Sequence, residues 1–110
     1  KRNETIKSVI DYIRSSTDLV ISIEQLCRDT GINKRTLERA FLDKYSVTPK
    51  SYLQSLRLNA AYKILLQSDP VTTKITDIAT GLGYWHMSQF AANYRRQFGE
   101  LPSETLKSHC

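Results

Sequence analysis

Apolar residues recur along this chain at intervals of three and four positions, which is the spacing of amphipathic α-helices. The first such stretch predicts a helix over residues 3–15. Its apolar positions are Ile6, Val9, Ile10 and Ile13. No stretch shows the strict alternation of apolar and polar residues that marks a half-buried β-strand. The pattern therefore predicts an all-α fold.

Residues that favour helix ends divide the next part of the chain into two short helices. Ser22 followed by Gln25 resembles a capping box, and Gly31 suits the left-handed position where a helix ends. Asn33 then caps a second helix over residues 34–45. The positions expected to be buried are Ile23, Leu26 and Cys27 in the first helix and Leu37, Ala40 and Phe41 in the second. The pair is predicted to form a helical hairpin.

A long helix and a second hairpin follow. Thr48 and Pro49 are suited to begin the longest helix, which extends to about residue 67. Its apolar stripe comprises Leu53, Leu56, Ala60, Ala61, Ile64 and Leu65. After a loop over residues 67–74, helices are expected at 75–82 and 86–98, and a short seventh helix begins at Pro102.

The second hairpin repeats the first. At an offset of 52 residues, Ile23, Leu26, Cys27, Gly31 and Ile32 match Ile75, Ile78, Ala79, Gly83 and Tyr84. At an offset of 53, Leu37, Phe41, Tyr45 and Pro49 match Phe90, Tyr94, Phe98 and Pro102. We therefore predict seven helices in two helix-turn-helix subdomains, at residues 1–48 and 69–110, joined by a linker helix at residues 49–68.

The outer face of the first hairpin carries two arginines. Arg35 and Arg39 lie one turn apart, opposite the apolar side of their helix. Arginine can bind the O6 and N7 atoms of guanine with two hydrogen bonds in the major groove. The alternative is an ordinary solvated face on which Glu38 pairs with Lys34 or Arg35. Because the module is repeated, we favour a helix that reads DNA.

The second hairpin carries weaker base-reading groups. Gln89 is suited to an adenine edge and Ala92 to a thymine methyl group. Arg95 and Arg96 lie farther along the helix and are better placed for phosphates, which supply affinity without sequence information. We expect the first hairpin to provide most of the base discrimination and the second to provide more of the anchoring.

Composition limits the other possibilities. The chain has 110 residues and 40% hydrophobic residues, which suits one small domain or two very small subdomains that share a connector. Its formal charge of +5 favours a polyanionic partner. No apolar stretch approaches the ~20 residues of a membrane span. Its two cysteines, Cys27 and Cys110, suggest neither a disulfide framework nor a zinc cluster. We expect a cytoplasmic protein and, because the chain begins at Lys1, a fragment of a longer one.

The linker helix has a length that suits DNA. From Pro49 to Gln67 it would span roughly 30 Å at about 1.5 Å per residue. Successive major-groove segments on one side of B-DNA lie ~34 Å apart. One chain is therefore predicted to place two recognition helices in adjacent grooves and to bend the DNA modestly towards itself.

Over about residues 4–107 the sequence resembles the AraC/XylS-type transcription regulators. The resemblance rests chiefly on Ile78, Ala79, Gly83, Tyr84, Ser88, Phe90, Tyr94, Arg95, Arg96, Phe98, Gly99 and Pro102. The string Leu56-Arg57-Leu58 followed by Ala61 is similar to the family's linker helix. The resemblance implies a bacterial regulator, often an activator, whose third and sixth helices enter consecutive major grooves.

The resemblance also implies site residues and partners. Base contacts would come from Lys34, Arg35, Glu38, Arg39, Met87, Ser88, Gln89 and Ala92. Backbone contacts would come from Lys50 and Ser103, at helix starts that favour phosphate, besides Arg95 and Arg96. Double-stranded DNA is the expected partner, RNA polymerase is a further one, and an effector-binding or dimerisation domain is expected before residue 1.

Some positions depart from the family's pattern. Lys74 and Leu101 stand where a Ser or Thr cap usually opens a helix, which makes those two helix starts less defined. Ala92 stands where some relatives carry arginine, which weakens readout by the second hairpin. Trp85 is interpreted as packing beneath the turn, with stacking on a DNA sugar as the alternative. His86 is interpreted as a capping or surface residue, with a phosphate contact as the alternative.

Two other classes of protein are the alternatives to a DNA-binding domain. A helical interaction module with a basic surface would bind an acidic protein partner. An enzyme is disfavoured because the sequence offers no nucleophile, base and orienting group together, no glycine-rich phosphate loop and no second metal ligand near His86 or His109. We therefore expect no catalysis, no cofactor and no metal.

Overall fold

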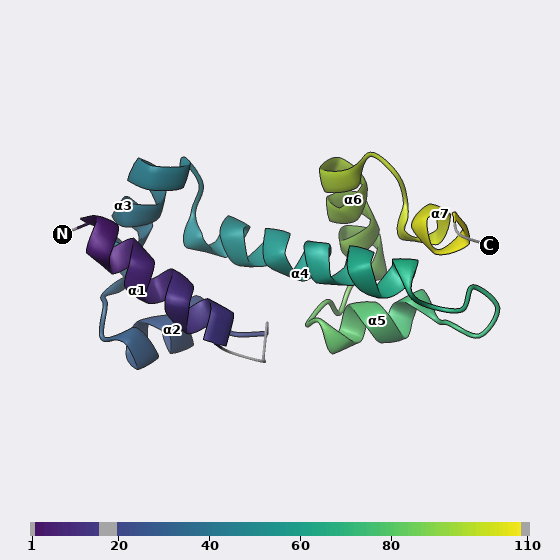
Figure 1. Cartoon of the computed structure of the whole chain (residues 1–110), viewed down its shortest axis with the longest axis horizontal. Helices are drawn as coiled ribbons and strands as arrows, with labels where there is room; N and C mark the ends of the chain where they lie inside the picture. The colour runs from purple at the N-terminus through teal and green to yellow at the C-terminus, as the bar shows by residue number, and fades with distance from the viewer. Residues whose placement is uncertain (1, 16–19, 109–110) are drawn as a thin grey trace. The chain divides into compact units, whose positions relative to one another are not determined.

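A computed structural model describes residues 2–15 and 20–108, with side chains from residue 4 onward. Within that part of the chain every regular element is a helix, which confirms the predicted all-α fold (Figure 1). The helices are α1 (Arg2–Ser15), α2 (Ile23–Thr30), α3 (Lys34–Tyr45), α4 (Pro49–Leu66), α5 (Ile75–Gly81), α6 (Met87–Phe98) and α7 (Pro102–Lys107). They fall into two compact units, Lys1–Gln54 and Ser55–Cys110, which divide within α4.

The first unit is built from α1, α2 and α3, which pack against one another. Its buried side chains include the four apolar positions predicted for α1. The buried hydrophobic residues of this unit are Ile6, Val9, Ile10, Ile13, Ile21, Leu26, Leu37, Ala40, Phe41 and Leu53. Phe41 also contacts the rings of Tyr45 and Tyr52, with centroids 5.8 and 5.3 Å away. This core fixes α3, so that its opposite face is left to solvent.

The caps predicted for the first hairpin are present. Ser22 accepts a hydrogen bond of 3.1 Å from the backbone N–H of Gln25, which opens α2. Gly31 ends α2 in the left-handed region at φ 72°. Asn33 Oδ1 accepts a hydrogen bond of 2.8 Å from the N–H of Thr36 and opens α3. These local interactions set where the hairpin turns.

The second unit has its own core. Its buried hydrophobic cluster comprises Leu58, Ala61, Leu65, Ala79, Phe90, Tyr94 and Leu106. The rings of Phe90 and Tyr94 lie 5.9 Å apart, and Tyr94 also contacts Phe98 at 4.6 Å. The same face of α6 therefore supplies most of the aromatic packing.

The apolar stripe predicted for α4 was wrong at one position and incomplete at another. Ile64 is 41% exposed, whereas Leu58, which the stripe omitted, is only 1% exposed. The reason is that α4 contributes to both units. Leu53 is buried in the first unit, and the second unit takes its own set of α4 side chains, including Leu65. The buried side chains of α4 therefore need not lie on one apolar stripe along the whole helix.

The two helix starts that lack a Ser or Thr cap form as helices nonetheless. Lys74 precedes α5 without a side-chain capping bond. At α7 the backbone N–H of Leu101 donates to Glu104 Oε1 at 2.8 Å, so a carboxylate inside the helix stabilises its start. Helices α5 and α6 are each one residue shorter than predicted, at Gly81 and Met87 respectively.

Candidate DNA interface

The two hairpins match in conformation as well as in sequence. Leu37 and Phe90, which are 53 residues apart, are both buried. The repeat also extends to the ends of α3 and α6. Ser46 and Gly99 both adopt the left-handed conformation there, at φ 59° and 79°. The duplication therefore includes backbone geometry that the apolar pattern alone does not specify.

The outer face of α3 is open. Arg35 and Arg39 are exposed, and neither has an ion-pair partner among the residues that the structure describes. Lys34 is also exposed, whereas Glu38 is half-buried. No ion pair between Glu38 and Lys34 or Arg35 occurs in this described part of the chain. The two guanidinium groups are thus free to bind an external acceptor.

The outer face of α6 is mostly small or polar at its start and basic towards its end. Ser88, Gln89 and Ala92 are exposed, and so are Arg95 and Arg96. On its inner side, Met87 is half-buried against the second core. Met87 and Glu38 are therefore the two half-buried residues among the predicted base contacts, and the other six are exposed.

Side-chain hydrogen bonds hold α6 against α4. Gln97 Nε2 donates to Asn59 Oδ1 at 2.9 Å and to the carbonyl oxygen of Ser55 at 3.2 Å. On the helix itself, Arg96 Nη1 donates to Asn93 Oδ1 at 3.3 Å. This last contact is long, so the Arg96 guanidinium keeps most of its donors for other acceptors.

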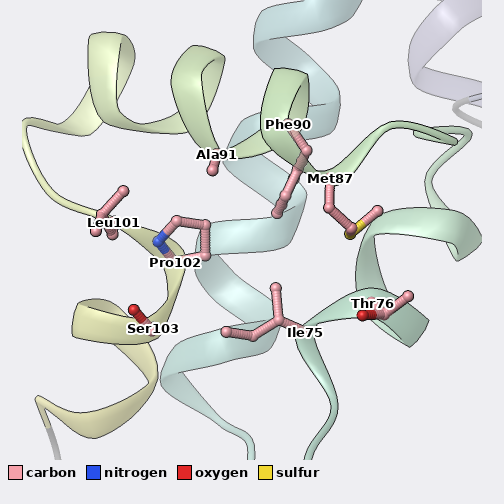
Figure 2. A pocket seen from close by; sticks show the side chains of 8 residues that line it. All are labelled: Ile75, Thr76, Met87, Phe90, Ala91, Leu101, Pro102 and Ser103. Carbon is pink, nitrogen blue, oxygen red and sulfur yellow. The ribbon is translucent and has the colours of Figure 1, made fainter.

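The predicted backbone-contact residues at helix starts differ in exposure. Lys50 is exposed on the first turn of α4. Thr48 caps the start of this helix, because its Oγ1 accepts a hydrogen bond of 3.1 Å from the N–H of Ser51. Ser103 is half-buried on the first turn of α7. It lines a shallow, mainly apolar pocket of about 280 Å³ (Figure 2). The other lining residues are Ile75, Thr76, Met87, Phe90, Ala91, Leu101 and Pro102.

The interpretation of Trp85 as a packing residue was wrong, because its side chain is 77% exposed. The preceding aromatic residue takes the inner position. The Tyr84 ring contacts Phe90 with centroids 5.0 Å apart, and its hydroxyl oxygen is buried without a hydrogen-bond partner among the described residues. Burial also raises the pKa of Tyr84 above its ordinary value. Periodicity outside a helix does not indicate which of two adjacent aromatic residues turns inward.

His86 and Cys27 are two further residues whose side chains could bind a ligand or react. His86 stands at the N-cap position of α6, where its side chain makes no capping bond and is exposed, so it is a surface residue. Cys27 is a half-buried free thiol whose pKa is raised by burial, with Glu24 adding to the effect. A raised pKa keeps the thiol protonated and unreactive. Cys110 and His109 lie outside the described residues.

Several tyrosines outside the proposed interface make ring contacts. The rings of Tyr45 and Tyr52 stack with centroids 5.7 Å apart, and those of Tyr62 and Phe98 stack at 4.9 Å. Tyr12 makes a different contact, because its hydroxyl donates a short hydrogen bond to Asp29 and so joins α1 to α2. These residues therefore belong to the scaffold.

Metal-binding clusters and membrane-spanning helices are absent among residues 2–15 and 20–108. No group of three or more His, Cys, Asp or Glu side chains is placed to hold a metal ion. None of the helices has the length and apolar character needed to cross a membrane.

Comparison with known proteins identifies the family. A family model described as a helix-turn-helix domain matches residues 26–108. The chain is 34% identical over 107 residues to the XylDLEGF operon transcriptional activator of Pseudomonas putida, covering 97% of the chain and 33% of that protein. It is 31% identical over 103 residues to the probable thc operon regulatory protein of Rhodococcus erythropolis, covering 94% and 31% respectively.

Solved structures agree with this result. A probable AraC family transcriptional regulator from Rhodopseudomonas palustris is 34% identical, with a TM-score of 0.82 over 96% of this chain and 97% of that one. An AraC-type regulator from Chromobacterium violaceum has a TM-score of 0.83 over 98% and 94% of the two chains, at 23% identity, and supports the fold. The chain belongs to the AraC-type helix-turn-helix family. It is a DNA-binding domain of the kind used in transcription regulation.

Proposed function

We propose that this domain binds double-stranded DNA at a specific sequence by inserting α3 and α6 into adjacent major grooves. In this proposal α3 provides most of the base discrimination, and α6 provides more of the anchoring to phosphates. The observation that carries it is the open pair of arginines on α3, on a helix fixed from behind by a buried core.

Base reading by α3 depends on Arg35 and Arg39. Both are exposed and lie one helical turn apart, so both can enter one groove with the helix. Neither is held by an ion pair within the described part of the chain, so binding would break no existing one. Lys34 and Glu38 are the neighbouring candidates, and the half-buried Glu38 can accept from a cytosine amino group only at its exposed edge.

On α6, the proposed base contacts come from Ser88, Gln89 and Ala92, with the half-buried Met87 in a minor role. Arg95 and Arg96, both exposed, are proposed to bind phosphates. Lys50 and Ser103 would add backbone contacts at the starts of α4 and α7. These backbone contacts are expected to add affinity through charge and to carry little sequence information.

The length of α4 supports the use of adjacent grooves. Its 18 residues correspond to about 27 Å along the axis. This is somewhat less than the ~34 Å between major-groove segments on one side of B-DNA. We therefore propose that the bound DNA bends modestly towards the protein. On this proposal, residues 1–48 and 69–110 are the two reading subdomains, and residues 49–68 are the linker.

The proposal extends to a longer protein. The chain spans about a third of the length of the relatives named above. Those relatives carry names that describe an operon regulator and an operon activator. We propose that the whole protein is a bacterial transcription activator of the cytoplasm, with an effector-binding or dimerisation domain before this one and RNA polymerase as a further partner.

Selection of bound sites from randomised duplexes tests the proposal. A single motif should emerge, with a footprint of about two helical turns and an affinity that falls steeply with salt. Recovery of unrelated sequences, or an affinity independent of salt, would contradict specific DNA binding. The alternative of an acidic protein partner would be favoured by the first of these outcomes.

A further inference from the structure

Trp85 is a large aromatic side chain left in solvent at a fixed position. It is 77% exposed, although an indole is among the side chains that gain most from burial. The turn that carries it is held by backbone hydrogen bonds, from the N–H of Gly83 to Thr80 at 3.1 Å and from the N–H of Tyr84 to Ala79 at 2.9 Å. Tyr84 further anchors the turn by packing on Phe90. The indole is therefore presented by a well-defined piece of backbone.

The turn lies next to the proposed DNA interface. Trp85 stands two positions before Met87, the first residue of α6, and the exposed Ser88 and Gln89 follow on the first turn of that helix. In helix-turn-helix proteins the start of the recognition helix reaches the base edges. A residue just before that start therefore approaches the rim of the groove, where the sugar-phosphate backbone runs.

We infer that the indole of Trp85 packs against a deoxyribose at the rim of the groove entered by α6, and that its Nε1–H donates to the adjacent phosphate. This inference rests on the proposed function. An indole suits such a site because its face is apolar and its single N–H is a donor only. The sugar offers an apolar C–H surface, and the phosphate offers acceptors.

The contact is predicted to be insensitive to sequence. Every nucleotide carries the same sugar and phosphate, so Trp85 would contribute affinity equally at specific and altered sites. The indole is also uncharged, so its contact releases no bound counterions. These two properties separate it from a base-reading residue and from a basic residue.

Binding measurements on variants of the 110-residue chain test the inference. On the duplex selected by the domain itself, Trp85→Ala should weaken binding by about tenfold, because the packing on the sugar and the hydrogen bond to the phosphate are both lost. Trp85→Phe keeps an aromatic ring but lacks the N–H donor, so it should weaken binding by about threefold. The slope of log affinity against log salt should stay unchanged for both, whereas Arg96→Ala should lower its magnitude by about one. The same factor for Trp85→Ala should appear on duplexes altered under α6.

A matched control is available in the same unit. Val71 is 88% exposed in the loop before α5, whereas Trp85 follows that helix in the chain. Val71→Ala should leave DNA affinity unchanged. Because both side chains are exposed, neither Trp85→Ala nor Val71→Ala should alter the melting temperature, which shows that a loss of binding is not a loss of folding.

Fluorescence gives a direct readout because Trp85 is the only tryptophan in the chain. Acrylamide should quench its emission strongly in the free protein and much less when the selected duplex is bound. A thymine methyl group is the competing apolar surface in the groove. Replacing each thymine under α6 with deoxyuridine should therefore leave the effect of Trp85→Ala unchanged.

The outcomes separate this inference from the proposed function. If the selected duplex binds but Trp85→Ala has no effect, or acrylamide quenching is unchanged on binding, the sugar-phosphate contact is wrong and DNA recognition stands. If the effect of Trp85→Ala disappears with deoxyuridine, the indole contacts a base and the inference is overturned. If the unaltered chain selects no duplex, the proposed function itself fails.

Discussion

The hydroxyl of Tyr94 donates a hydrogen bond of 2.7 Å to Oγ1 of Thr105, and both side chains are fully buried. Thr105 in turn donates a short hydrogen bond to the carboxylate of Glu100. This chain of hydrogen bonds joins α6 to α7 inside the second core. It also satisfies two hydroxyl groups that would otherwise be costly to bury.

Breaking this chain at either residue should destabilise the domain, to different extents. Tyr94→Phe removes one hydrogen bond and should lower the free energy of unfolding by about 1 kcal/mol. Thr105→Val leaves the Tyr94 hydroxyl buried without an acceptor, so it should cost more, about 1–3 kcal/mol. Urea denaturation measures both values. A Thr105→Val variant more stable than Tyr94→Phe would show that the hydroxyl finds another partner.

Tyr84 presents the opposite case. Its buried hydroxyl oxygen has no hydrogen-bond partner among the described residues, although its ring packs on Phe90. Tyr84→Phe keeps the ring and removes the hydroxyl, so the free energy of unfolding should be unchanged or higher by up to about 1 kcal/mol. Thermal unfolding beside Tyr94→Phe provides the comparison. A clear loss of stability in Tyr84→Phe would mean that the hydroxyl is bonded in solution.

Stability should fall at alkaline pH. Burial raises the pKa of both Tyr84 and Tyr94 above the ordinary value of 10.0, although Arg57 and the Thr105 hydrogen bond oppose the shift in part. The folded protein therefore keeps protons that the unfolded chain releases. This contribution is complete below about pH 10 and is lost as pH rises through the folded-state pKa values. Urea titrations on both sides of pH 10 should show a shallower decline for Tyr84→Phe than for the unaltered chain. An identical decline would contradict this.

The residue that ends α3 is a serine, and the matching residue at the end of α6 is a glycine. Ser46 adopts φ 59° where the second hairpin has Gly99 at φ 79°. The left-handed region strains a residue with a side chain, so Ser46→Gly should raise the free energy of unfolding by about 0.5–1 kcal/mol. Gly99→Ala should lower the free energy of unfolding by about 1 kcal/mol for the same conformational reason. The added methyl group would meet no atom within 4 Å, so steric overlap would not contribute to this loss. Changes of the same sign in both variants would refute this explanation.

Local signals in the sequence predicted much of the fold. The apolar positions of α1, such as Ile6 and Val9, are buried, because a surface helix has only one face to bury. Ser22 and Asn33 were correctly predicted as caps, because capping depends on atoms within one turn of the chain. The outward direction of Arg35 and Arg39 followed from the same helical geometry.

Features that depend on distant parts of the chain could not be predicted. Ile64 is exposed because α4 is divided between two cores. The spacing of apolar residues along α4 does not reveal this division. Trp85 is exposed, whereas the adjacent Tyr84 packs on Phe90 of the following helix. The partnership of Tyr94 with Thr105 joins separate helices and leaves no pattern in the sequence.

The division of roles between the two recognition helices is the centre of the proposed function. Base-preference profiles of Arg39→Ala and Arg96→Ala, measured on every single-base variant of the selected duplex, test it most directly. Arg39→Ala should lose about 1–3 kcal/mol of discrimination at one base pair, whereas Arg96→Ala should weaken all sequences by the same factor. Equal, sequence-independent losses in both variants would contradict base reading by α3.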